Sequence, residues 1–248
     1  MIEQTLAGKT ALITGSARRI GAAIASTLHA KGATVILHYH QSKIEAEALA
    51  QTLNAERRDS AFLVRADLIE ADLSPMMQQV LAHNKGLDIL VNNASLFYPT
   101  YLQWDAVSAH TLMQVNAFAP YQLSLLARTA LEKRQGAIIN LVDTHADNPL
   151  RDYGLYSQSK AALRQQTLSL AKELAPHIRV NAVAPGAILW PEAKAALEET
   201  QKMAVLKGIP LQGLGTPEDI AEAVLYLATA SYVTGVILPV DGGRMLKK

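Results

Sequence analysis

The sequence contains no cysteine among its 248 residues. Thiolate metal sites, disulfide bonds and cysteine catalysis are therefore excluded. Aromatic residues make up only 5% of the chain, and a formal net charge of +1 provides no polybasic surface for nucleic acid. No apolar run is long enough to span a membrane, and the amino-terminal residues have no signal-peptide pattern. We expect a cytoplasmic protein that binds neither nucleic acid nor membrane.

Short apolar runs rich in β-branched residues alternate with longer helical patterns along the chain. This alternation predicts βαβ units that build a doubly wound parallel sheet with helices on both faces, a Rossmann-type α/β fold of about seven strands. The length favours a single domain over residues 1–248. The predicted strands occupy residues 10–14, 34–39, 61–67, 87–94, 137–142, 178–185 and 236–243. Ligands of such sheets bind beyond the carboxyl ends of the strands, so the polar residues that follow each strand are candidate site residues.

The first polar cluster follows the first predicted strand and leads into a helical pattern. Glycines at such a turn let the backbone approach a pyrophosphate, and the helix amino terminus supplies N–H donors. Arg19 stands where a nucleotide-binding loop often carries a middle glycine, so the G-x-G-x-x-G rule is not met as written. A turn shaped only for packing is the alternative, but the two arginines favour a cofactor loop. Its candidate residues are Gly15, Ser16, Arg18, Arg19, Ile20 and Gly21.

The residues after the second predicted strand indicate the preferred dinucleotide. An Asp or Glu there would bind a ribose 2′-hydroxyl, and residues 38–42 include neither. Donors that could hold a 2′-phosphate lie near Arg18 instead, which predicts NADPH. The donor candidates are His38, Tyr39, His40 and Ser42. The alternative is that the two histidines only end the strand. After the third strand, Asp67 and Leu68 are candidates for the adenine pocket.

Tyr156 and Lys160 form the candidate catalytic pair. In a helix that begins near residue 153, residues four apart lie on one face with about 6 Å between their Cβ atoms. A lysine cation there would favour phenolate and bring the tyrosine pKa from about 10 towards neutral pH. Tyr39 and Lys43 have the same spacing but fall at a predicted strand, where the side chains are too far apart to cooperate. Spacing alone leaves an ordinary helix-surface pair as the alternative.

The sequence resembles the short-chain dehydrogenase/reductase family in motifs that occur in the family's order: the glycine loop, NNA at residues 92–94, Asn116, the Tyr156/Lys160 pair and Pro185-Gly186. This resemblance implies that Tyr156 exchanges a proton with the substrate, that Lys160 binds the nicotinamide ribose, and that Asn116 helps to hold a water linked to the lysine. It also implies cofactor contacts for Asn93, Ala94, Pro185 and Gly186. Thirteen residues before the tyrosine the family usually has serine, and this chain has Asp143.

Asp143, with the runs TGSARRIG, NNASLFYPTYL and HYHQS, resembles the pteridine reductase branch, including bacterial dihydromonapterin reductases. The resemblance implies that Arg19 approaches both the cofactor phosphate and the pterin, and that Ser95 lies beside them. It implies that Phe97 stacks on the pterin, while Asp143 works with Tyr156 in proton delivery. A flat ring with a nitrogen-rich edge suits this set, although core packing is the alternative for Phe97.

The other inferences concern the lid, the cofactor and assembly. Residues 187–212 form a helical, polar stretch where relatives carry a small substrate lid, and Trp190 and Pro191 either line the pocket or cover the core. Gln41 stands where the eukaryotic enzymes have an arginine, which bears on the strength of NADPH binding. Family resemblance implies a homotetramer, although core packing would produce the same apolar helix stripes.

The leading functional hypothesis is an NADPH-dependent reductase of a pterin C=N bond. Its substrate would be a dihydropterin, such as dihydromonapterin or dihydrobiopterin, or dihydrofolate, reduced to the tetrahydro form. A ketone reductase of the same family, in which Asp143 merely replaces the serine, is the second hypothesis. The third is a nucleotide-sensing regulator that keeps the fold without turnover.

Overall fold

A seven-stranded sheet with strand order β3-β2-β1-β4-β5-β6-β7 forms the centre of the computed structural model, which describes residues 5–83, 86–190 and 198–246. All its strand pairs are parallel. The strands are β1 (Thr10–Ile13), β2 (Thr34–Tyr39), β3 (Ala61–Arg65), β4 (Ile89–Asn92), β5 (Ala137–Leu141), β6 (Arg179–Pro185) and β7 (Ile237–Val240). Each lies within one of the predicted runs, so the predicted doubly wound, Rossmann-type fold is confirmed.

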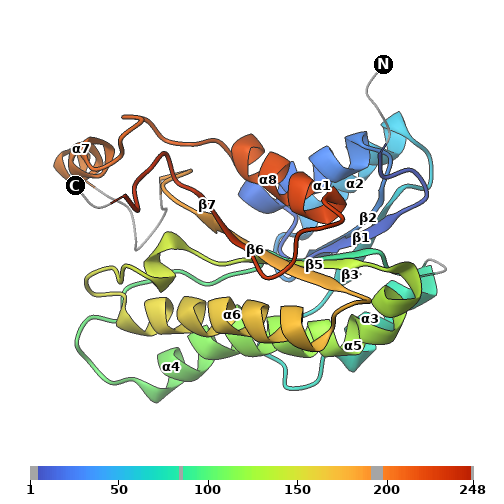
Figure 1. Cartoon of the computed structure of the whole chain (residues 1–248), viewed down its shortest axis with the longest axis horizontal. Helices are drawn as coiled ribbons and strands as arrows, with labels where there is room; N and C mark the ends of the chain where they lie inside the picture. The colour runs from blue at the N-terminus through green and yellow to red at the C-terminus, as the bar shows by residue number, and fades with distance from the viewer. Residues whose placement is uncertain (1–4, 84–85, 191–197, 247–248) are drawn as a thin grey trace.

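Helices cover both faces of the sheet (Figure 1). Helices α1, α2 and α8 pack on one face, and α3, α5 and α6 pack on the other. The helices are α1 (Arg19–Ala30), α2 (Lys43–Glu56), α3 (Ser74–His83), α4 (Ala106–Met113), α5 (Ala119–Arg134), α6 (Gly154–Glu173), α7 (Glu199–Lys207) and α8 (Pro217–Thr229). A π-helical turn, η1 (Gln114–Phe118), joins α4 to α5, and a 3₁₀ turn, η2 (Thr144–Ala146), follows β5. In the described part of the chain, no helix is long and apolar enough to cross a membrane.

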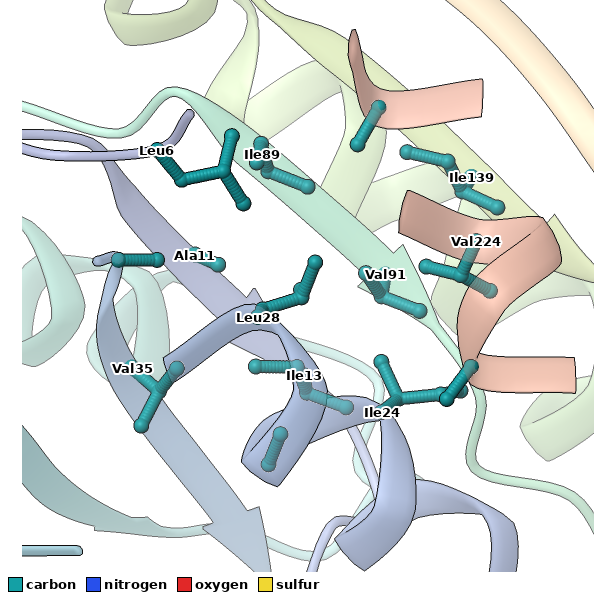
Figure 2. Packing of buried hydrophobic residues seen from close by; sticks show 14 of the residues in the cluster. Leu6, Ala11, Ile13, Ile24, Leu28, Val35, Ile89, Val91, Ile139 and Val224 are labelled. Carbon is teal, nitrogen blue, oxygen red and sulfur yellow. The ribbon is translucent and has the colours of Figure 1, made fainter. Parts of the chain in front are cut away.

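Helix α1 is held over the sheet by one buried face. Figure 2 shows its Ile24 and Leu28 among Ile13 and Val91 of the sheet and Val224 of α8. Residues four apart in a helix share a face, so both α1 side chains point into this core. Burying each one fully contributes about 1.5–3 kcal/mol to folding. This packing fixes the amino end of α1 beside the end of β1.

The strand register brings the polar loops to one edge of the sheet. Ile13 of β1 pairs with Leu37 of β2 and with Val91 of β4, and Asn92 of β4 pairs with Asn140 of β5. The carboxyl ends of these strands are therefore level. The strand order reverses between β1 and β4, which is where ligands of open α/β sheets bind.

Candidate active site

The loop between β1 and α1 has the backbone shape of a nucleotide-binding turn, although its middle glycine is an arginine. Gly15 has φ +61°, and Arg19 has φ +55°, in the left-handed region that glycine adopts freely. A non-glycine residue held there costs about 1–2 kcal/mol. A Cβ on Gly21 would lie 2.2 Å from the carbonyl oxygen of Gly15, so no side chain fits at this position. The Asn93 amide donates to that same carbonyl at 3.0 Å and holds the loop against the end of β4.

A cavity of about 530 Å³ opens beside this loop. The predicted cofactor residues that come from the loops after β1, β2, β3 and β4 all line this cavity, except Ser16. Ser16 is fully buried, and its N–H and hydroxyl donate to the carbonyl of His38 at 3.0 and 3.3 Å. Ser16 therefore supports the loop from behind.

The predicted 2′-phosphate donors are in different environments. The exposed Arg18 guanidinium lies 3.7 Å from the carboxylate of Glu45, and His40 lies 3.4 Å from the carboxylate of Asp67. His38 is buried, its Nδ1 accepts from the Gly15 N–H at 3.0 Å, and burial lowers its pKa to about 4. Its Nε2 lies 3.2 Å from the carbonyl of Ala66, so both ring nitrogens are within bonding distance of backbone groups, and a phosphate contact of His38 stays a prediction. Glu45, an acid in the first turn of α2, is a neighbour that the sequence prediction overlooked.

A second cavity, of about 700 Å³, adjoins the first through shared walls at Arg19, Ile20, Asn93 and Ser95. It brings together all the predicted substrate residues and three of the predicted cofactor residues. The substrate set is Arg19, Ser95, Phe97, Asp143, Tyr156 and Trp190, and the additional cofactor set is Lys160, Pro185 and Gly186. The space therefore joins the dinucleotide site to the residues predicted to carry out chemistry.

Tyr156 and Asp143 form the central pair of this cavity. The phenol of Tyr156, in the first turn of α6, donates to Oδ2 of Asp143 at 2.5 Å. The other carboxylate oxygen, Oδ1, accepts from the backbone N–H of His145 at 2.8 Å. Asp143 thereby caps η2, and the cap fixes the direction of the carboxylate. One oxygen is used to hold the turn and the other meets the phenol.

The charges around Tyr156 act opposite to the effect predicted for its lysine. Burial, followed by the negative charge of Asp143 and its hydrogen bond, raises the Tyr156 pKa well above its ordinary value. The Lys160 ammonium lies 6.0 Å from the ring centroid and donates instead to the carbonyl of Leu141 at 2.8 Å. Burial lowers the pKa of Lys160 to about 8, although Asp143 acts to raise it. The prediction that Lys160 brings Tyr156 towards phenolate is wrong for this structure, which keeps the proton on the phenol.

Phe97 contacts two tyrosines at the cavity wall. Its ring stacks on Tyr153 at a centroid distance of 4.6 Å and meets the edge of Tyr156 at 4.8 Å. Phe97 is 36% exposed, so part of its surface remains open to a ligand. Tyr153 is absent from the sequence prediction. Its position three residues before Tyr156 could have indicated that it lies on the same side of the helix.

Asn116 lies in the π-helical turn behind the cavity and is fully buried. Its carbonyl oxygen accepts from the Leu96 N–H at 2.8 Å and the Ser95 hydroxyl at 3.1 Å, while its amide donates to the Ser159 hydroxyl at 3.0 Å. The side chain thus ties the loop after β4 to helix α6. The water contact that the resemblance implied for Asn116 stays a prediction.

Two further contacts shape the cavity mouth. The N–H groups of Thr100 and Tyr101 both donate to the carbonyl of Asp152, at 2.8 and 3.0 Å, and join the loop that carries Phe97 to the segment before α6. On the other side, Arg19 donates to the Trp190 carbonyl at 3.2 Å. Trp190 lines the cavity, which decides between the two roles left open for it.

Part of the predicted lid is visible at this wall. Helix α7 contributes Gln201 and Val205 to the cavity, and the Lys202 ammonium lies 5.9 Å from the Trp190 ring centroid. Residues 191–197, which include Pro191, lie outside the described residues. In the described ranges, no group of three or more His, Asp or Glu is arranged to hold a metal ion.

Comparison with known proteins identifies the family. Residues 15–244 match the family described as enoyl-(acyl carrier protein) reductase. Pteridine reductase 1 of Leishmania tarentolae is 38% identical, with 96% of each chain covered. The chain belongs to the short-chain dehydrogenase/reductase family. It is an oxidoreductase of that family with a dinucleotide-binding fold.

Other members of the short-chain dehydrogenase/reductase family are similar to a comparable degree. A 3-oxoacyl-(acyl-carrier-protein) reductase of Aquifex aeolicus is 36% identical over 98% of this chain and 99% of its own. The solved structure of a blue fluorescent protein from a metagenomic library, in complex with NADPH, matches with a TM-score of 0.90 and 33% identity, covering 97% of this chain and 99% of that one. Sequence identity alone therefore does not identify the substrate. The substrate has to be inferred from the side chains of the second cavity.

Proposed function

We propose that this protein is an NADPH-dependent reductase that converts a dihydropterin to its tetrahydro form. The observation that carries the proposal is the Asp143 carboxylate, 2.5 Å from the Tyr156 phenol at the wall of the second cavity. Relatives support the cofactor, since one solved structure of this fold is a complex with NADPH. The glycine loop fits that cofactor, because Gly21 has no room for a Cβ and the first cavity opens along the loop.

Reduction of a C=N bond adds a hydride to carbon and a proton to nitrogen. NADPH supplies the hydride when bound. The protein's own residues must supply the proton. Tyr156 is suited to deliver it because its raised pKa keeps the phenol protonated. The Asp143 carboxyl bonds the phenol at Oδ2, so the two side chains act as one proton-delivery pair.

The walls of the second cavity support a flat, polar heterocycle. Phe97 offers an aromatic surface, for which stacking on a flat base contributes about 1–3 kcal/mol. Arg19 and Ser95 line the same space and supply donors for the polar edge of a ring. A simple ketone would need none of these groups beyond the proton donor.

The test compares dihydropterin and ketone reduction in wild type, Asp143→Ser and Asp143→Asn, each followed by NADPH oxidation. We expect both variants to keep NADPH affinity and to lose about 10²-fold or more in kcat/KM for a dihydropterin, because neither side chain supplies the carboxyl group that works with the Tyr156 phenol. Asp143→Asn keeps the size of the side chain and so controls for packing. Equal dihydropterin reduction by wild type and Asp143→Ser would refute the proposed role.

The same panel tests the two alternatives. A protein that reduces ketones and not dihydropterins is a carbonyl reductase in which Asp143 replaces the usual serine. A protein that binds NADPH but does not oxidise it when a substrate of either class is added is a nucleotide-sensing regulator. The panel should include dihydromonapterin, dihydrobiopterin and dihydrofolate, because the choice of pterin side chain depends on the cavity mouth.

A further inference from the structure

His38 occupies an unusual place for a residue next to a dinucleotide site. It is the next-to-last residue of β2 and lies among polar residues that line the first cavity, yet it is only 2% exposed. A side chain that binds a phosphate must offer a donor to it. Both ring nitrogens of His38 are within bonding distance of backbone groups instead.

The hydrogen bonds fix the state of the ring. A backbone N–H can only donate, so Nδ1 accepts from Gly15 at 3.0 Å and carries no proton. The neutral ring then has its proton on Nε2, which donates to the carbonyl of Ala66 at 3.2 Å. Burial opposes a second proton, and so does the neighbouring His40, whereas the Ala66 bond and Asp67 favour one. The imidazole is therefore a neutral bridge between the glycine loop and the segment after β3.

His38 also holds the next residue of the loop through its backbone. Its carbonyl accepts from the N–H of Ser16 at 3.0 Å, so two consecutive loop amides bond to one residue. From the other side, the Asn93 amide bonds the carbonyl of Gly15 at 3.0 Å. The Gly15 residue is thus held by β2 through its N–H and by the end of β4 through its carbonyl.

We propose that His38 is a positioning residue for the dinucleotide: its ring sets the glycine loop in the conformation that receives the pyrophosphate, and it makes no contact with the 2′-phosphate. The pyrophosphate is common to NADPH and NADH, whereas the 2′-phosphate belongs to NADPH alone. Loss of the ring should therefore lower the affinity for both cofactors by the same factor. The proposal rests on the cofactor part of the proposed function and is independent of the substrate.

The experiment measures the Kd of NADPH and of NADH, without substrate, by titration calorimetry. In His38→Ala, the buried Gly15 N–H loses its acceptor, and we expect both affinities to fall by a similar factor of roughly tenfold. In His38→Asn, the side-chain oxygen can take the place of Nδ1 and accept from Gly15. This variant should bind both cofactors within about threefold of wild type if the acceptor is what matters.

His29 provides a matched control for general loss of stability. It is also 2% exposed, and its ring bonds the Ser60 hydroxyl at 2.7 Å near the carboxyl end of α1, away from the glycine loop. His29→Ala should lower the melting temperature without changing either Kd. If His38 had a purely structural role, His38→Ala would give the same result. His40→Ala provides the contrast, since an exposed 2′-phosphate donor should affect NADPH more than NADH.

Each outcome decides the proposal. A parallel loss of both cofactors in His38→Ala, recovered in His38→Asn, supports it. A selective loss of NADPH would make His38 a phosphate ligand, and unchanged Kd values at a lowered melting temperature would make it a core residue only; either result overturns the proposal. If wild type binds neither dinucleotide, the cofactor assignment fails and the proposal fails with it. Failure of dihydropterin reduction alone leaves the binding result intact, so the two failures are distinguishable.

Discussion

Burial of the Lys160 ammonium should give folding stability a distinct pH dependence. The pKa of this lysine falls from an ordinary 10.5 to about 8 in the folded chain. Between these values the unfolded chain binds a proton that the folded chain lacks, so the free energy of unfolding rises as the pH increases through this window. Below about pH 8 both states are charged and the full cost of burying the cation is present.

The size of the effect follows from the same two values. The span from 10.5 to about 8 corresponds to about 3 kcal/mol, at 1.36 kcal/mol for each pKa unit. Of this, about 2 kcal/mol should appear between about pH 7.5 and about pH 9.5. Tyr156 acts in the opposite direction at higher pH, because its raised pKa keeps it protonated when the unfolded chain has ionised. The measurement therefore stays below about pH 10.

The assay is urea unfolding followed by circular dichroism at the two pH values, with wild type and Lys160→Met at one protein concentration. Over this pH range the free energy of unfolding of wild type should rise by about 2 kcal/mol relative to that of the variant, which has no group to titrate at this position. Lys133 on α5 is exposed, so Lys133→Met should retain the wild-type rise. Parallel curves for wild type and Lys160→Met would refute a lowered pKa of Lys160 in the folded chain.

Three other predictions address the site directly. Tyr156→Phe should lose at least about 10²-fold in kcat, as for a missing general acid, and near-normal turnover would remove the phenol from the mechanism. Phe97→Ala should raise KM for a dihydropterin by a factor equivalent to about 1–3 kcal/mol while changing kcat less, and an unchanged KM would assign Phe97 to packing. NADPH should give a higher kcat/KM than NADH, because Arg18, His40 and Ser42 line the first cavity and residues 38–42 include no acid; equal values would contradict the phosphate site.

The sheet could be predicted because its strands are unambiguous in sequence. A strand covered on both faces is apolar over most of its length, and β1, β4 and β5 are buried at every residue. Because all the strands run parallel, their carboxyl ends lie at the same edge of the sheet, and the residues that follow different strands meet there. The gathering of Asp143, Tyr156 and Lys160 in one cavity is a consequence of that topology.

The electrostatic state of the pair could not be predicted, because it depends on distances and burial. The i, i+4 spacing places Lys160 near Tyr156, yet its ammonium bonds Leu141, while Asp143 meets the phenol. The role of His38 likewise depends on which backbone groups surround its ring. The homotetramer stays a prediction, and light scattering of the purified protein would test it.

The left-handed backbone of Arg19 has a consequence for attempts to stabilise this protein. A designer who seeks thermostability would choose Arg19→Gly, since glycine adopts φ +55° freely and restores the common nucleotide-binding pattern. The relief would be at most about 1–2 kcal/mol. The same substitution would delete the guanidinium that lines both cavities and bonds the Trp190 carbonyl. At this residue, optimising the fold and keeping the two binding spaces connected by one side chain are opposing design goals.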